Sequence, residues 1–248
     1  MGNQQTFNQI YVYDCEKKDY QSISISNFEF GRFISKGGMR AAFLCSFNIK
    51  NEKFTMVAKK YYNEDTKTNN RKINEDIFAQ TLCNSYAEIF NDINTYNKKI
   101  EFLKPYLFVD DKGCSWLLEK LLRGTFRKWT NNTGFVDNSN MTPISFSHWV
   151  FDNYGFLICD LQGITEGNKY LLTDPQILTK KSGFMSGDIG LKGIACFINE
   201  HTCNDICTNL KLRNITEIKF TSIYEKLLTD ATKTFEDKYN DFFYQQKK

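Results

Sequence analysis

The chain has 248 residues, of which 41% are apolar and 15% aromatic, enough to bury a core in one large domain or in two lobes. Its net charge of +3, from 32 Lys and Arg against 29 Asp and Glu, does not favour a nucleic-acid-binding protein, which usually carries a clustered basic face. No apolar run approaches the length of a membrane-spanning helix.

The N-terminus matches the pattern for N-myristoylation, with Gly2 after the initiator and Thr6 at the hydroxyl position. An unmodified polar N-terminus can match this short pattern by chance, so myristoylation and an unmodified N-terminus both stay open. A single acyl chain would give only weak, reversible membrane association. No secretory signal precedes the eight cysteines, and we expect a reducing, cytoplasmic location with membrane association only if Gly2 is acylated.

The first third of the chain is predicted to form mainly strands, over 28–34, 41–47 and 54–62. The first two are joined through the segment Gly37-Gly38-Met39-Arg40. A glycine pair between strands is an ordinary turn, or a loop whose backbone approaches phosphate groups closely.

A helix is predicted over 75–93, where apolar residues recur at three- and four-residue spacing. Short extended runs follow around Phe102, Leu107 and 116–118. Strands, a helix and further strands are typical of an α+β fold, here the small N-terminal lobe.

The second half of the chain begins with a predicted buried strand, 156–160, that ends in an acidic residue. Helices are predicted over 194–199 and 206–212, and a further helix over 218–243 that packs on the body or binds a partner.

Four potential zinc ligands occur in this half: His148, His201, Cys203 and Cys207. Cys203 and Cys207 are four residues apart and would share a helix face. Together the four would complete a closed tetrahedral site with no position left for chemistry. A buried cysteine pair beside an unrelated surface histidine is the alternative that the spacing alone favours, because His-x-Cys-x-x-x-Cys is not among the commonest zinc-site spacings.

Several residues suit phosphoryl transfer, which needs a cation for the phosphates, oxygen ligands for Mg²⁺ and an acid that orients the nucleophile. Lys59 lies in a predicted strand, and Asp160, Gln162 and Asp174 supply oxygen ligands. Taken singly, each of these residues is better explained by a structural role. The sequence has neither a Walker loop nor the usual kinase signatures.

The order of these motifs resembles the alpha-kinase family, the atypical protein kinases of the myosin heavy chain kinase, elongation factor 2 kinase and channel-kinase type. The matching segments are Gly38-Met39-Arg40, Val57-Ala58-Lys59, Leu118-Glu119, 126–132, 146–149, Asp160-Leu-Gln162-Gly163, Thr173-Asp174-Pro175 and 201–207. The resemblance implies a two-lobed, protein-kinase-like α+β fold with a structural zinc site in the C-terminal lobe. It also implies the use of ATP and Mg²⁺ to phosphorylate serine or threonine in a protein substrate.

The resemblance assigns roles to residues of the N-terminal lobe. Lys59 is the expected ligand of the nucleotide phosphates, and its expected ion-pair partner is Glu75 or, slightly favoured, Asp76. Glu119 corresponds to the hinge acid near the adenine. The segment Gly38, Met39 and Arg40 is the expected phosphate-covering loop.

Further roles follow for the C-terminal lobe. Asp160 is expected to position the substrate hydroxyl, and Gln162 and Asp174 to hold Mg²⁺. Asn131 falls in an asparagine-bearing stretch near the active site. His148, His201, Cys203 and Cys207 match the zinc ligands of the family.

The glycine loop departs from the family pattern, which places a glycine where this chain has Met185 and an asparagine where it has Asp188. Gly187 and Gly190 are retained as expected nucleotide-site residues. A new negative charge near substrate or phosphate would weaken binding or change the peptide preference. It also motivates the alternative of a catalytically impaired pseudokinase or nucleotide-binding signalling module.

The resemblance predicts a catalytic domain over 28–213, with an N-lobe at about 28–120 and a C-lobe at about 121–213. Residues 1–27 are expected to form an N-terminal extension and residues 214–248 a C-terminal helical extension. The predicted function is an active alpha-kinase-type protein serine/threonine kinase.

Overall fold

The computed structural model describes residues 8–14, 16–94 and 98–214. They divide into two compact units. The first comprises the described residues up to Thr81 together with Lys104–Leu122, and the second comprises Leu82–Leu103 and the described residues from Arg123 onward. Both units mix strands with helix, as the predicted α+β class requires.

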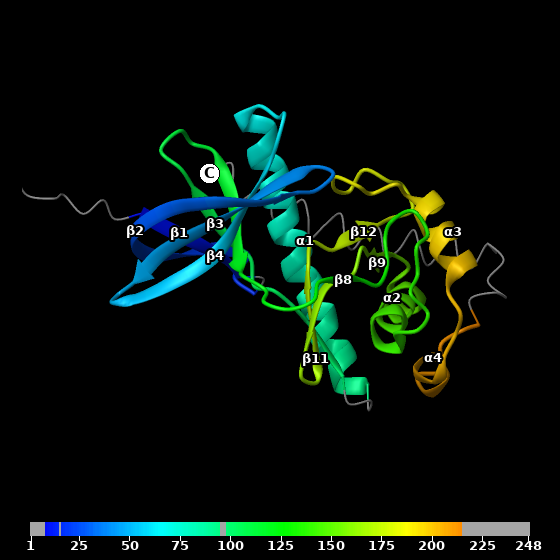
Figure 1. Ribbon diagram of the computed structural model, residues 1–248. Coiled ribbons are helices and arrows are strands. Elements are labelled where there is room, and N and C mark those ends of the chain that lie inside the picture. Colours follow the sequence, from blue (N-terminus) through cyan, green and yellow to red (C-terminus); the bar gives the residue numbers. More distant parts are fainter. Residues whose placement is uncertain (1–7, 15, 95–97, 215–248) are drawn as a thin grey trace, which may run out of the picture. The chain divides into compact units, whose positions relative to one another are not determined.

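The first unit is a closed antiparallel barrel with the strand order β1-β2-β3-β4-β7-β6 (Figure 1). The strands are β1 (Asn8–Asp14), β2 (Asp19–Lys36), β3 (Arg40–Ile49), β4 (Glu52–Tyr61), β6 (Tyr106–Val109) and β7 (Ser115–Lys120). Met56 and Ala58 of β4 lie in the barrel core with Phe47 and Leu118. Successive residues of a strand face opposite sides, so Lys59 points out of the barrel.

Residues 8–27, expected in an N-terminal extension, contribute β1 and the first part of β2 to this barrel. The two strands pair antiparallel from Asn8↔Ile25 to Asp14↔Asp19. Ile10 and Ile25 are fully buried, so this hairpin supplies part of the barrel core.

The helix α1 (Thr66–Ile93) begins nine residues before the predicted start. Asp65 precedes it, and its carboxylate accepts hydrogen bonds from the backbone N–H and the hydroxyl of Thr68. The Thr68 hydroxyl lowers the pKa of Asp65, as expected for a carboxylate at a helix start. The first turns are polar, so they carry no apolar stripe by which a periodicity argument would detect them.

The second unit contains a four-stranded sheet with the order β5-β11-β10-β8 and the two-stranded sheet β12-β9. The strands are β5 (Lys99–Phe102), β8 (Arg127–Lys128), β9 (Leu157–Cys159), β10 (Gln162–Glu166), β11 (Lys169–Thr173) and β12 (Gln176–Leu178). The helices are α2 (Met141–Tyr154), α3 (Leu191–Glu200) and α4 (Asp205–Asn209). A core of Phe151, Leu157, Leu178, Ile194 and Phe197 joins α2, the small sheet and α3.

Helix α2 was not predicted from the sequence. Ten consecutive residues from Thr142 to Phe151 are buried, so the helix has no polar face and no amphipathic period. Pro143 near its start is compatible with a first helical turn, where its missing N–H would have had no helical partner.

No helix among the described residues has the length and apolar character needed to cross a membrane. Gly2 and the predicted helix over 218–243 lie outside the described residues.

Candidate active site

The first unit buries an ion pair between Lys59 on β4 and Glu119 on β7. The two strands are direct neighbours, with Val57 opposite Glu119. Gln80 of α1, also buried, donates a hydrogen bond to the same carboxylate at 3.4 Å. The lysine predicted to bind the nucleotide phosphates is therefore held by the residue that the resemblance assigned to the hinge.

A second buried acid, Asp76 of α1, forms an ion pair at 2.6 Å with Arg40 at the start of β3. The hydroxyl of Tyr61 also donates to Asp76, at 3.0 Å. The neighbouring Glu75 pairs with Arg71, one helical turn away. The acids expected to partner Lys59 thus have their own basic partners, and Arg40 links the predicted phosphate-covering loop to α1.

The loop before Arg40 is held by its own backbone and by a tyrosine. Gly37 donates its N–H to the Arg40 carbonyl at 2.9 Å, and the Tyr62 hydroxyl donates to the carbonyls of Gly37 and Gly38. A Cβ at Gly38 would have no heavy atom within 4 Å, and Met39 is 38% exposed. The loop therefore presents an open backbone surface, as a phosphate-covering loop needs.

In the second unit, Asp160 follows β9 directly and lies 2.5 Å from the ammonium of Lys128 on β8. The segment after β8 is held against Leu161, whose carbonyl accepts the N–H of Trp129 at 2.8 Å. Asp160 has a left-handed backbone, with φ of 56°. Sequence reasoning gave no role to Lys128, although it lies in a segment that carried the family resemblance.

The register of the sheet brings the expected Mg²⁺ ligands to the same end. Gln162 on β10 pairs with Thr173 on β11 and with Lys128 on β8. Asp174 follows Thr173 directly and is also left-handed, with φ of 56°. Carboxylate and amide oxygens are suitable ligands for Mg²⁺, so the donors at this end fit that ion.

Gly163, the residue after Gln162, lies where only a glycine fits. Its φ is +153°, and a Cβ there would lie 1.9 Å from the carbonyl oxygen of Leu171. Any side chain would force β10 and β11 apart, so glycine is required for the pairing that brings Gln162 beside Thr173.

Asn131 has a structural role in the described residues. Its side-chain oxygen accepts the N–H groups of Thr133 at 2.9 Å and Phe135 at 2.8 Å, an Asx-type turn. The turn follows Trp129 and Thr130, which bond to Leu161 beside Asp160. Its neighbour Asn132 bonds the carbonyl of Gly187, another predicted site residue, at 3.0 Å.

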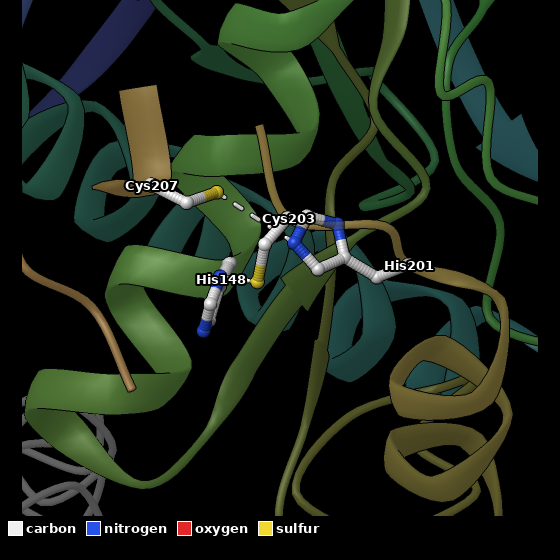
Figure 2. Close-up of side chains that lie close together, drawn as sticks. All are labelled: His148, His201, Cys203 and Cys207. Atoms are coloured by element: carbon white, nitrogen blue, oxygen red, sulfur yellow. Dashed lines mark hydrogen bonds between the residues drawn. The ribbon is translucent and has the colours of Figure 1, made fainter. Parts of the chain in front are cut away.

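The four predicted metal ligands converge, although they come from α2, the end of α3, the segment between α3 and α4, and α4 (Figure 2). Their ligand atoms all lie within 4.8 Å of one another. Cys207 Sγ is 3.6 Å from His201 Nε2, and Cys203 Sγ is 3.9 Å from His148 Nδ1. Two imidazole nitrogens and two sulfurs match the donors of a closed tetrahedral zinc site.

Burial keeps the imidazole rings of His148 and His201 uncharged. It lowers the pKa of His148 to about 4 and that of His201, with a further contribution from His148, to about 3. Burial raises the pKa of the Cys207 thiol. Neutral imidazoles are the form that binds metal, whereas a buried thiolate needs a cation beside it to offset its desolvation.

Comparison with known proteins finds a match to the alpha-kinase family over residues 35–207. Myosin heavy chain kinase B of Dictyostelium discoideum is 40% identical over 149 residues, 57% of this chain and 20% of that protein. Eukaryotic elongation factor 2 kinase of Caenorhabditis elegans is 34% identical over 165 residues, 64% of this chain and 20% of that protein. The chain spans about a fifth of the length of these curated relatives.

The crystal structure of the alpha-kinase domain of myosin heavy chain kinase A in complex with AMP superposes with a TM-score of 0.73 at 25% identity. The match covers 84% of this chain and 99% of the solved domain. The same domain in complex with AMP-PNP gives a TM-score of 0.74 at 24% identity, over 89% of this chain and 98% of that domain. The expected alpha-kinase fold with mixed strands and helices is therefore confirmed, whereas the zinc site stays a prediction.

Proposed function

The chain belongs to the alpha-kinase family, and we propose that it is an ATP- and Mg²⁺-dependent protein serine/threonine kinase. The observation that carries this proposal is the arrangement around Asp160, which pairs with Lys128 at 2.5 Å while Gln162 and Asp174 lie at one end of the neighbouring sheet. An acid, a cation and two oxygen ligands are the groups that phosphoryl transfer needs.

Each residue then has a defined task. Asp160 accepts a hydrogen bond from the serine or threonine hydroxyl and orients it, and the cation of Lys128 offsets negative charge beside that acid. Lys59 binds a nucleotide phosphate, held in place by Glu119. Gln162 and Asp174 would hold Mg²⁺, which neutralises charge on the phosphates.

The alternative of an impaired pseudokinase rested on Met185 and Asp188. Both side chains are buried in the loop that carries them, with exposures of 5% and 8%. This burial supports the active-kinase proposal, because the negative charge of Asp188 is not exposed on the loop surface.

The test is transfer of labelled phosphate from Mg-ATP to a generic basic protein, for the parent and for Asp174→Ala. We expect transfer by the parent and a loss of at least about a hundredfold in the variant, because a Mg²⁺ ligand is removed. Asp111→Ala, at an exposed carboxylate of the first unit, serves as the control and should retain the parent rate. Full activity in Asp174→Ala would refute the assignment of the site.

The same assay distinguishes the pseudokinase. That protein would show no transfer, while Mg-ATP could still raise its melting temperature in a thermal-shift measurement. A parent protein that is stabilised by Mg-ATP but transfers no phosphate would replace the first proposal with the second.

We further propose that His148, His201, Cys203 and Cys207 bind one Zn²⁺ in a structural role, supported by the convergence of their ligand atoms. Elemental analysis of the folded protein should find about one zinc per chain. A folded preparation without zinc would contradict this. A cytoplasmic location, with membrane association through acylated Gly2, stays a proposal that mass analysis of the N-terminal peptide would test.

A further inference from the structure

The loop between β12 and α3 is organised around the carboxylate of Asp188. Oδ1 accepts the backbone N–H groups of Thr179 at 3.1 Å and Gly190 at 2.9 Å. Oδ2 accepts the Thr179 hydroxyl at 2.8 Å and the backbone N–H of Phe184 at 3.1 Å. All four donors come from the loop and its two ends, so this one side chain closes the segment 179–190 on itself.

This arrangement requires a carboxylate rather than an amide. Three of the donors are backbone N–H groups, which cannot act as acceptors, and they use both oxygens. An asparagine would put its NH₂ group in the place of one oxygen. An NH₂ group in the place of Oδ2 would face the Phe184 N–H, so the hydrogen bond from Phe184 would be lost, while the Thr179 hydroxyl could turn to accept a hydrogen bond from the NH₂ group. In the place of Oδ1 it would lose two bonds.

The loop is also braced against the strand that leads to Asp160. The carbonyl of Gly187 accepts a hydrogen bond from Asn132 at 3.0 Å. Gly187 has φ of +94°, and a Cβ there would lie 1.9 Å from Oε1 of the buried Gln176. Gln176 pairs with Cys159, the residue directly before Asp160. Loop and catalytic acid are thus connected through one pair of strands.

We infer that Asp188 is a positioning residue for the phosphoryl acceptor, because it fixes the 179–190 loop against the strand pair that places Asp160. Its charge is used by the loop itself rather than presented to substrate. The inference rests on the proposed kinase function. It also reverses the expectation that the departure from asparagine weakens the site, since in this chain the asparagine would be the poorer residue.

The first test is amide exchange, followed residue by residue by NMR, in the full chain and in Asp188→Asn. We expect exchange at Phe184 to accelerate about tenfold, the factor that about 1.4 kcal/mol represents, while Thr179 and Gly190 stay within about twofold of the parent. Asp92→Asn, at an exposed carboxylate of the same unit, should change none of the three. Unchanged exchange at Phe184, or an equal rise at all three amides, would overturn the inference.

The second test is steady-state kinetics with Mg-ATP and the basic protein acceptor. Asp188→Asn should raise KM for the acceptor about tenfold and leave KM for ATP within about twofold. Thr179→Val, which removes only the hydroxyl donor, should shift the acceptor KM in the same direction by a smaller factor, and it remains informative if Asp188→Asn fails to fold. An unchanged acceptor KM in both, or equal shifts for acceptor and ATP, would overturn the acceptor role.

The two tests separate failure of this inference from failure of the proposed function. A parent protein that transfers no phosphate refutes the kinase proposal and with it the acceptor role, whereas amide exchange still decides whether Asp188 closes the loop.

Discussion

The buried ion pair between Lys59 and Glu119 should show strong energetic coupling. Their side chains are 9% and 3% exposed, so replacing either one alone leaves the other charge buried. Breaking a buried pair in this way costs about 3–5 kcal/mol of stability. We therefore expect Lys59→Met and Glu119→Leu each to lower the melting temperature by roughly 10 °C.

The double variant should be more stable than either single one. Two apolar side chains of similar volume remove both charges, and such replacements are often nearly neutral. Glu119 also accepts a hydrogen bond from the buried Gln80, so the double variant leaves that donor without this acceptor, at a cost of about 1–2 kcal/mol. The coupling energy should therefore be about 3 kcal/mol or more.

Urea denaturation of the parent and the three variants measures this coupling. The pair between Lys72 and Glu64, with side chains 19% and 29% exposed, is the matched control, and its cycle should give less than about 1 kcal/mol. If the double variant cost as much as the two single changes added together, the two side chains would be independent and the reasoning refuted. Phosphoryl transfer should be lost in every variant that lacks Lys59, regardless of stability.

Three further predictions concern the second unit. Gly187→Ala should lower phosphoryl transfer at least about tenfold, because its Cβ would collide with Gln176. The control Gly183→Ala, with φ of +80° and no heavy atom within 4 Å of the new Cβ, carries only backbone strain of about 1 kcal/mol. Equal activities of the two variants would contradict this. Removing zinc with a chelator should lower the melting temperature of the parent and of Cys196→Ser alike but not that of Cys207→Ser, and a parent whose melting temperature does not change would argue against a structural metal. In metal-free protein, stability should fall as the pH drops from about 6.5 towards 4: burial lowers the folded-state pKa of His148 to about 4 and of His201 to about 3, so the unfolded chain binds more protons in that range. Urea denaturation at pH 7 and pH 5 measures this loss, which should be smaller in His148→Gln; an equal loss in both proteins would exclude the histidines as its cause.

Two of the barrel strands and one acidic residue of the candidate site could be predicted, because short stretches of sequence indicate them. The strands predicted over 41–47 and 54–62, which flank a polar turn, match β3 and β4. Asp160 stands out because it directly follows the predicted buried strand, whereas the role of Asp174 was assigned only through the family resemblance, since the strand before it was not predicted. The family resemblance then supplied the order in which such residues belong together.

What escaped prediction depends on contacts between distant segments. Helix α2 is buried on all sides, so its sequence has no amphipathic period. The ion pair of Lys59 with Glu119 follows from the neighbouring positions of β4 and β7, which the sequence does not show. Asp188 appeared to be an added charge, because nothing in the sequence shows that four donors converge on it.

The cluster of His148, His201, Cys203 and Cys207 has a topological consequence. Asp160, Gln162, Asp174 and the 179–190 loop all lie between His148 and His201 in the chain, so the cluster closes a ring of backbone around them. A bound metal would act as a crosslink that restricts the unfolded chain, as a disulfide does. A protease cut within that ring would then leave two fragments still joined through the metal.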